Sequence, residues 1–299
     1  MDPHLLRTYV TVARLRSFSA AARELGYTQS AVSQHIAALE QDLGLPLLGR
    51  RPVAPTPAGE RLLEHAGSLL LRIDAARADL AGYAAAPREE LTVAAAPLAA
   101  HPAVLDALPS TGVTLRVLPR DEVPGAVATG GADLGLVDGI AAPSDPLALP
   151  DVAPLTAAAL PGAAAEPLVV VVPDDHPLAR RAGVRLTDLA DARWLDAPAV
   201  GPPLERLRAA VGTPGGFRPS LRYEGTDVRT LVALAAAGHG LVLLPAGAAR
   251  TADVAADVAA VPVVAPRLVH RTELLRPGGV SAGPVARVLD ALGVASQGP

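Results

Sequence analysis

The sequence has no cysteine and no lysine, and only 2% of its 299 residues are aromatic. The lack of cysteine excludes disulfides, thiolate metal sites and cysteine nucleophiles. All 26 basic residues are arginine, a bias that suggests a GC-rich genome and says little about function. The amino terminus lacks the unbroken apolar stretch of a signal peptide, because Asp2, His4 and Arg7 interrupt it. We therefore expect a cytoplasmic protein.

The sequence also has little that indicates a membrane span, a metal site or catalysis. Its most apolar window, Val232–Ala249, contains His239, Pro245 and three glycines, which favours a buried helix-turn-strand over a membrane helix. The histidines beyond residue 100 are dispersed and show no HExxH spacing. They are His101, His176, His239 and His270. We expect no metal, no cofactor and no enzymatic activity.

Length and charge allow several domains but do not by themselves identify a partner. A chain of 299 residues is about twice the length of a typical domain, so two or three folding units are expected. The net charge is −4, yet residues 1–61 hold seven arginines against five acids. This slight basic excess does not establish nucleic-acid binding, which has to be argued from the pattern of the first segment.

The amino-terminal segment has the order of a helix-turn-helix. Apolar spacing and capping residues predict the helices Leu5–Leu15, Ala20–Leu25 and Gln29–Leu43. Ser19 is the expected N-cap of the second helix, which Gly26 ends. Thr28 is the expected N-cap of the third helix, which Gly44 ends. A short helix, a tight glycine turn and a longer helix are typical of DNA-binding modules.

The third helix has one apolar stripe and one small, uncharged face. The expected buried stripe is Val32, Ile36, Leu39 and Leu43, and the other face carries Gln29, Ser30, Ser33, Gln34 and Ala37. A face of this kind can approach base edges in the major groove, where glutamine pairs with adenine. The alternative is an ordinary solvated helix face, although such faces usually carry more charge.

Two adjacent arginines follow the third helix. Arg50 and Arg51 lie on a short turn, which suits a wing that touches phosphates or the minor groove. The alternative is a pair of exposed arginines on an ordinary loop.

The run from Ser17 to Leu48, SFSAAARELGYTQSAVSQHIAALEQDLGLPLL, resembles the DNA-binding module of the LysR-type transcriptional regulators. The resemblance implies a winged helix-turn-helix over residues 1–58. It implies that Thr28, Gln29, Ser30, Ser33 and Gln34 face the operator and that the wing arginines contact DNA. The sequence departs from the family pattern at Leu48, where Phe is usual, and in a wing, Arg50–Thr56, that looks shorter.

A long helix is expected over residues 59–88. Thr56 and Pro57 form a cap and first turn, and no strong breaker appears before Pro87. A coiled-coil seam is formed by residues in steps of four and three. These are Leu62, Ala66, Leu69, Ile73, Ala76 and Leu80. The alternative is an amphipathic helix packed on its own domain. The family dimerises through this helix, so the resemblance implies a homodimer or homotetramer on an inverted-repeat operator.

From Leu91 onward, short apolar strands alternate with helical segments, which predicts an α/β fold. The expected strands are Leu91–Ala95, Thr114–Leu118, Leu134–Val137, Leu168–Val172, Arg193–Leu195, Ser220–Tyr223 and Leu241–Leu244. Three stretches in this region, 132–137, 166–173 and 231–245, are similar to the effector domain of the same family. That resemblance implies two lobes like those of periplasmic binding proteins. The stretch Pro161–Pro167, with Gly162 and a run of alanines, is the expected crossover between them. Lobe I would comprise residues 89–162 and 268–299, and lobe II residues 163–267.

The resemblance places a small-molecule effector between the lobes. Carried over to this chain, Ala96, Pro97 and Leu98 after the first strand and Thr226 in the second lobe would line the cleft. Helix starts there would offer backbone N–H groups to an anion. The family often has Ser or Thr at the first of these turns, whereas this chain has none, which argues against a conventional carboxylate effector.

The sequence thus predicts an all-α winged helix-turn-helix with a long linker helix, followed by a two-lobed α/β effector domain. The function expected is regulation of transcription, with double-stranded DNA, a second copy of the chain and a small molecule as partners. RNA polymerase is left open as a further partner, and no membrane is expected. Two alternatives remain: a solute-binding protein or enzyme built on the two-lobed body, and a DNA-binding protein without an effector.

Overall fold

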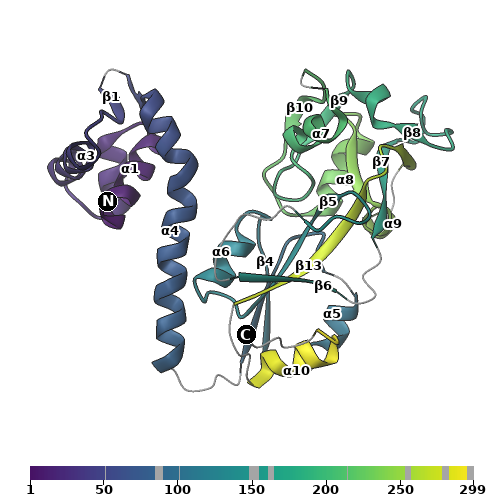
Figure 1. Ribbon diagram of the computed structural model, residues 1–299. Helices are drawn as coiled ribbons and strands as arrows, with labels where there is room; N and C mark the ends of the chain where they lie inside the picture. Colours follow the sequence, from purple (N-terminus) through teal and green to yellow (C-terminus); the bar gives the residue numbers. More distant parts are fainter. Residues whose placement is uncertain are drawn as a thin grey trace. The chain divides into compact units, whose positions relative to one another are not determined.

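The computed structural model describes residues 1–50, 52–84, 90–100, 102–147, 155–160, 165–213, 215–252, 257–277 and 283–294. The chain forms two compact units, Met1–Gly82 and a larger one that begins at Tyr83 (Figure 1).

The first unit begins with three helices whose ends follow from local capping. They are α1 (Pro3–Leu15), α2 (Phe18–Leu25) and α3 (Gln29–Leu43). The Thr28 side chain accepts a hydrogen bond from the Ala31 N–H and caps α3 as predicted. The cap of α2 is Ser17, which accepts from the Ala20 N–H, so the prediction of Ser19 is wrong. The predicted helix begins two residues later than α2 does. The structure extends α2 to Phe18, which packs partly buried against the core of this unit.

One hydrophobic core holds the three helices together. Leu6, Tyr9 and Val12 of α1 pack with Val32 and Leu39 of α3, and each is at most 1% exposed. Leu43 is 37% exposed, so its assignment to the buried stripe is wrong. The last turn of α3 extends past this core.

A two-stranded hairpin, β1 (Leu48–Arg50) and β2 (Val53–Pro55), follows α3 and forms the wing. Two contacts of Glu40 fix where the hairpin begins: its Oε1 accepts from the backbone N–H groups of Leu47 (2.8 Å) and Leu48 (3.2 Å). The wing is therefore anchored to α3.

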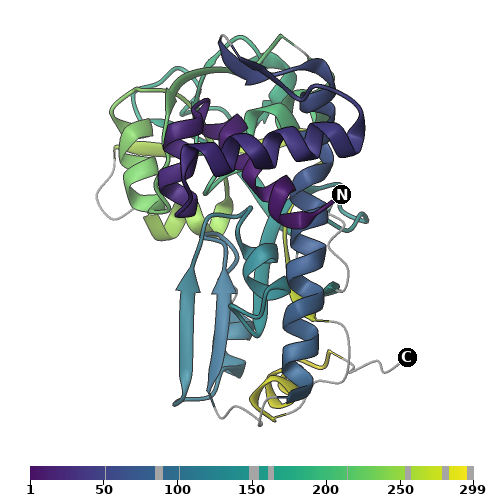
Figure 2. The ribbon, with the colours of Figure 1, turned by 90° about the vertical axis from the view of Figure 1, so that its left-hand side faces the viewer.

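The long helix α4 (Pro57–Ala84) packs its first half on the same unit. The Thr56 Oγ1 accepts from the Gly59 N–H and donates to the Pro46 carbonyl, which joins the helix start to the segment before the wing. At Gly59 a Cβ atom would overlap the Leu47 carbonyl oxygen and lie 2.5 Å from the Tyr9 hydroxyl. Farther along, Asp74 pairs with Arg7 of α1 at 2.6 Å. In Figure 2, α4 is the long blue helix and α1 to α3 are purple.

The second unit is built on a nine-stranded sheet in the order β4-β3-β5-β13-β7-β12-β8, with β6 paired to β13 and β11 paired to β7. The strands are β3 (Leu91–Ala95), β4 (Val113–Val117), β5 (Leu134–Ala141), β6 (Leu155–Ala159), β7 (Glu166–Pro173), β8 (Val184–Arg185), β11 (Val242–Pro245), β12 (Val258–Ala265) and β13 (Val269–Pro277). β9 (Arg193–Asp196) and β10 (Arg218–Arg222) form a separate parallel pair. The helical elements are α5 (Pro102–Ala107), α6 (Val123–Ala128), η1 (Leu186–Leu189), α7 (Leu204–Val211), α8 (Val228–Ala236), α9 (Ala246–Ala252) and α10 (Gly283–Ala291).

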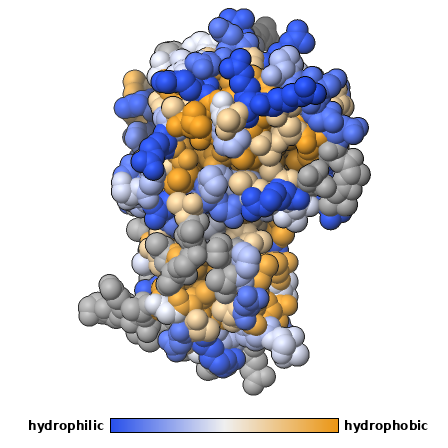
Figure 3. All heavy atoms as spheres, turned by 90° about the vertical axis from the view of Figure 1, so that its right-hand side faces the viewer, coloured by the Kyte–Doolittle hydropathy of each residue, from blue (hydrophilic) through white to orange (hydrophobic). Residues whose placement is uncertain are grey.

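Separate sets of buried side chains divide this unit into lobes, with one set in lobe I and two in lobe II, where alternate residues of β7 belong to different sets. The core of lobe I contains Leu91, Leu134 and Leu274, and lobe II contains Trp194 and Phe217. β3 and β4 of lobe I run parallel, side by side in Figure 2. Figure 3 shows hydrophobic side chains among hydrophilic ones on one face of the unit.

The strand β13 joins the lobes. It pairs antiparallel with β5 and β6 of lobe I, while its first residues, Val269 and His270, pair with Pro167 and Glu166 of β7. The seven expected strands all occur, most with ends shifted by a few residues, but β6, β8, β12 and β13 were not predicted. The predicted connector Pro161–Pro167 lies mostly outside the described residues, and Glu166 already belongs to β7.

The apolar window Val232–Ala249 is the buried helix-turn-strand that was predicted, formed by α8 and β11. Among the described residues, no helix is long and apolar enough to cross a membrane. No cluster of three metal-ligating side chains occurs in that part of the chain.

Candidate functional sites

The outward face of α3 is fully presented to solvent in the first unit. Thr28, Gln29, Ser30, Ser33 and Gln34 are all exposed. Two small contacts order its beginning: the Ser19 hydroxyl donates to Gln29 Oε1 at 3.2 Å, and the Thr28 and Ser30 hydroxyls lie 3.0 Å apart. Within the described residues, the side chains of Ser33 and Gln34 have no intramolecular hydrogen bond. Their donors and acceptors are available to a partner.

The inner side of α3 is fixed to α1 through a histidine. His35 Nδ1 lies 3.1 Å from the Thr8 hydroxyl, and its ring packs edge-on against Tyr27 with 5.2 Å between ring centroids. Because His35 is next to Gln34, these contacts set the rotation of the exposed face about the helix axis.

The predicted wing arginines are only partly described. Arg50 is the last residue of β1, and its side chain lies outside the described residues, as does the whole of Arg51. The backbone of Arg50 pairs with Val53 in this hairpin. Their contact with DNA stays a prediction.

The predicted seam of α4 divides into two parts. Ala66 is completely buried, and Leu62 and Leu69 are partly buried against the core of their own unit. Ile73 is partly buried as well, whereas Ala76 is exposed and Leu80 is 69% exposed. The first half therefore matches the alternative of a helix packed on its own domain, and an unpaired apolar surface begins only near Ala76.

A cavity of about 550 Å³ opens in the second unit, a size that suits a small molecule. Its apolar lining comes from both lobes and includes Pro97, Leu98, Pro102, Val117 and Pro245. Its polar lining includes Glu166, Thr226, Asp227, Arg229, Arg250 and His270. Of the four residues predicted here, Pro97, Leu98 and Thr226 line the cavity. Ala96 does not: it is 1% exposed, and its N–H donates to the Leu136 carbonyl.

At the helix starts beside the cavity, carboxylates of the chain itself accept hydrogen bonds from the N–H groups that were predicted to bind an anion, so this part of the prediction is wrong. At α8, the Asp227 carboxylate accepts from the N–H groups of Arg229 (3.3 Å) and Thr230 (2.9 Å). The Thr230 hydroxyl donates to the same carboxylate at 2.6 Å. These hydrogen bonds lower the pKa of Asp227, and the one from the Thr230 side chain makes the largest contribution. The chain's own carboxylate occupies the anion-binding end of α8.

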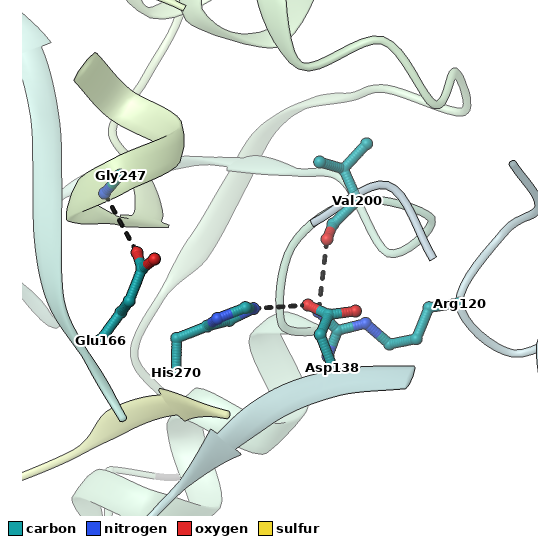
Figure 4. Close-up of polar contacts among 6 residues, drawn as sticks. All are labelled: Arg120, Asp138, Glu166, Val200, Gly247 and His270. Carbon is teal, nitrogen blue, oxygen red and sulfur yellow. Dashed lines mark hydrogen bonds and ion pairs between the residues drawn. The ribbon is translucent and has the colours of Figure 1, made fainter. Parts of the chain in front are cut away.

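A second carboxylate occupies the start of α9. Glu166 Oε2, from the first residue of β7, accepts from the Gly247 N–H at 3.1 Å (Figure 4). A Cβ atom at position 247 would lie 2.9 Å from this oxygen, so the close approach depends on glycine. Near the first strand, Pro97 has no N–H group to donate and no helix begins before Pro102.

Beside Glu166 lies a buried polar chain that crosses between the lobes (Figure 4). Asp138 Oδ2 of β5 lies 2.8 Å from His270 Nε2 and accepts from Arg120 Nη2 at 2.7 Å. The Asp138 side chain is 0% exposed and those of His270 and Arg120 are 7% and 13% exposed. Arg120, in lobe I, also donates to the Val200 carbonyl of lobe II at 3.3 Å. Burial lowers the pKa of the Arg120 guanidinium, which the carboxylate of Asp138 opposes.

The comparison with known families decides the identity of the chain. A family model described as a bacterial regulatory helix-turn-helix protein of the lysR family matches residues 3–60. A second, described as the LysR substrate binding domain, matches residues 84–292. The chain belongs to the LysR family. It is a LysR-type DNA-binding transcriptional regulator with a carboxyl-terminal effector domain, as the resemblance predicted.

Curated relatives of this LysR-type regulator match over most of their length. The uncharacterized HTH-type transcriptional regulator YnfL of Escherichia coli is 31% identical over 81% of this chain and 81% of its own. A probable hydrogen peroxide-inducible genes activator of Mycobacterium avium is 33% identical, covering 81% and 77% of the two chains.

Solved structures share the fold along the whole chain. Full-length CbnR complexed with its target DNA has a TM-score of 0.52 at 22% identity and covers 98% of this chain and 99% of that one. A cysteine mutant of OxyR from Corynebacterium glutamicum has a TM-score of 0.50 at 26% identity, with 98% and 90% covered.

One of the cavity residues that were not predicted could have been found from its sequence context. Asp227 precedes a helical pattern directly and has the signature of an N-cap. Glu166 and His270 carry no local signal, because they meet only through the pairing of β7 with β13. Arg120 and Asp138 likewise come together through the tertiary fold.

Proposed function

We propose that this LysR-type regulator works in the cytoplasm and binds an inverted-repeat operator through the exposed faces of α3 from two chains. The observation that carries this proposal is the uncharged face of α3, on which the side chains of Ser33 and Gln34 have no hydrogen bond to another residue of the described part of the chain. Such a face fits the major groove, where a glutamine amide pairs two-pronged with adenine. Phosphate contacts from the wing, at Arg50 and Arg51, fix the register.

Two chains are needed because one α3 reads only a few base pairs. In helix-turn-helix dimers the two recognition helices reach half-sites about one helical turn apart. The exposed end of α4 around Ala76 and Leu80 supplies an apolar surface for a second copy, as a dimer or within a tetramer. The CbnR structure, which shares this fold, was solved in complex with its target DNA.

We further propose that a small molecule in the cavity modulates DNA binding. Pro97, Leu98 and Val117 come from lobe I and Thr226 and Pro245 from lobe II, so one ligand contacts both lobes. Such a ligand shifts the lobes toward the arrangement for which it has higher affinity. The absence of cysteine excludes thiol oxidation as the input signal. The relatives are named as regulators and activators of genes, and we propose no catalytic role.

The proposal is tested by titrating the full chain against DNA from upstream of its own gene and against random DNA of equal length. Binding to the upstream DNA should be tighter and should weaken as salt rises, because bound arginines displace counterions from phosphates. Equal affinity for both DNAs at moderate salt contradicts sequence-specific reading.

A further inference from the structure

The polar groups at the buried end of the cavity point to a particular class of ligand. Glu166 and His270 are direct partners in the antiparallel pairing of β7 with β13, so both side chains lie on the same face of the sheet. Cβ atoms of such partners are about 4.5–5.5 Å apart, which lets one small group contact both side chains. Both residues line the cavity.

The hydrogen bond to Asp138 determines which nitrogen of His270 carries a proton. Asp138 accepts from the Arg120 guanidinium, so its carboxylate is an acceptor and His270 Nε2 must be the donor across their 2.8 Å contact. The charge of Asp138 is already balanced by Arg120. In the neutral imidazole this leaves Nδ1 as a hydrogen-bond acceptor, and no group among the described residues donates to it.

The charge of Glu166, in contrast, has no counter-ion. Its one hydrogen bond in the described part of the chain comes from the uncharged N–H of Gly247, and no cationic side chain there lies within ion-pair distance. Glu166 is partly buried, where an unpaired carboxylate is more costly than in water. The buried end of the cavity therefore combines a net negative charge with two acceptors, and the donor beside them on β13, the Thr272 hydroxyl, is uncharged.

The other charged groups that line the cavity are at its exposed side. Asp227 and Arg229 are exposed at the start of α8, and Arg250 is exposed on α9. Solvent screens these groups, so their effect on a ligand at the buried end is small beside that of Glu166. Leu98 and Val117 provide an apolar wall.

We propose that the effector is a small molecule with an apolar body and an ammonium group, and that the ammonium donates to the Glu166 carboxylate and to His270 Nδ1. An ammonium has three donors and a positive charge, which satisfies both acceptors and supplies the missing counter-ion. This assignment rests on the proposed function of the cavity as the effector site, and it names the chemical class that the site selects.

The test compares three probes with one apolar body: cyclohexylmethylamine, cyclohexylmethanol and cyclohexanecarboxylate. Calorimetric titration of the full chain should show the amine binding at least about tenfold more tightly than the alcohol or the acid, as expected for one charge-assisted pair. In Glu166→Gln this preference should disappear, while the amide oxygen still accepts from Gly247. The preference for the amine should persist in Glu205→Gln, which removes an exposed carboxylate of α7 outside the cavity.

An acid or alcohol that binds as tightly as the amine, or an undiminished preference in Glu166→Gln, overturns the proposal. Folding of each variant is checked through the fluorescence of Trp194, the one tryptophan of the sequence, which is buried in lobe II. Binding of the same protein to its upstream DNA is measured separately, so that failure of the ligand class is distinguished from failure of the regulatory function.

Discussion

At the residue scale, the DNA-reading surface depends on side chains that are polar but uncharged. Ser33 and Gln34 are exposed and free of intramolecular hydrogen bonds in the described part of the chain. Neighbouring residues on the same helix, by contrast, are fixed: His35 contacts Thr8, and Glu40 holds the start of the wing. The helix therefore combines a rigid inner side with an outer side whose hydrogen-bonding groups are available to bases.

Replacing Gln34 by Ala should weaken binding to the operator by about 1–3 kcal/mol, because a two-pronged contact with adenine is lost. Binding to random DNA should change little. Gln41→Ala is the matched control, since Gln41 is an exposed glutamine in the last turn of α3, two turns beyond the residues expected to enter the groove. Fluorescence anisotropy on both DNAs measures the two losses, and equal loss on both DNAs contradicts a base-reading role.

Tyr9 is a buried residue whose hydroxyl has no hydrogen-bond partner among the described residues. Burial, with smaller contributions from Glu60 and Glu40, raises its pKa from 10.0 to about 12. The unfolded chain loses this proton at lower pH than the folded chain does. Stability contributed by the neutral phenol is therefore present below pH 10.0 and is lost as the pH rises from there toward 12.

Tyr9→Phe should thus leave stability near neutral pH unchanged or slightly raised, because no hydrogen bond is removed. Above pH 10.0 the variant should lose less stability than the wild type. Urea unfolding followed by far-UV circular dichroism at about pH 7 and about pH 11 provides the comparison. A large loss for Tyr9→Phe at neutral pH would show that the hydroxyl has a partner in solution.

At the scale of elements, α4 begins at a point where the chain crowds its own backbone. Gly59 lies against the Leu47 carbonyl and the Tyr9 hydroxyl, so the first turn of the helix can approach the core only without a side chain. This contact places the linker helix directly against α1 and the segment before the wing.

Gly59→Ala should destabilise the first unit by about 1–3 kcal/mol, since the new methyl overlaps backbone that cannot move freely. Gly67→Ala on the same helix is the control: a Cβ there meets nothing within 4 Å, so better helix propensity should stabilise by about 0.5–1 kcal/mol. Both changes in the free energy of unfolding are measured by following the helical circular-dichroism signal during urea unfolding. Adding Tyr9→Phe should not rescue Gly59→Ala, because the Leu47 carbonyl remains in place.

Elements with strong local signals were predictable from the sequence, and those made by long-range pairing were not. Thr28 and Gly44 delimit α3 through hydrogen bonds with their own neighbours, so the prediction of Gln29–Leu43 is confirmed. β13 was missed because His270, Arg271, Glu273 and Arg276 interrupt its apolar residues. Its polar side chains are buried through distant partners, as when Glu273 accepts from the Leu147 N–H.

In the candidate cavity, too, residues near local sequence motifs were predictable and residues that meet through long-range strand pairing were not. Pro97, Leu98 and Thr226 were found by resemblance, because they follow or precede recognisable motifs. The groups that determine its electrostatics, Glu166 and His270, are brought together by the pairing of β7 with β13, a strand that the sequence did not reveal. The expectation of free helix starts failed, because two carboxylates of the chain itself occupy them.

At the scale of the whole molecule, the regulator needs a second copy to read two half-sites. Half of the predicted seam on α4 is already used within its own unit. Within the described part of this seam, the apolar surface left for a partner is therefore limited to the end of the helix, where Leu80 is 69% exposed.

Leu80→Glu should shift the chain from dimer to monomer and weaken operator binding, because a charge is placed in an apolar contact between copies. Ser68→Glu is the control, since Ser68 is exposed on α4 away from the seam. Sedimentation velocity gives the oligomeric state of each variant. A Leu80→Glu chain that sediments like the wild type and the Ser68→Glu control refutes this site of dimerisation.

Reading of a specific operator by α3 can be tested in the cell with a genome-wide binding map of the wild type beside one of Gln34→Ala. The wild-type sites should share an inverted repeat with half-sites about one helical turn apart, and these sites should be lost in the variant. Wild-type sites without a shared sequence, or an unchanged map for Gln34→Ala, would contradict operator reading by α3.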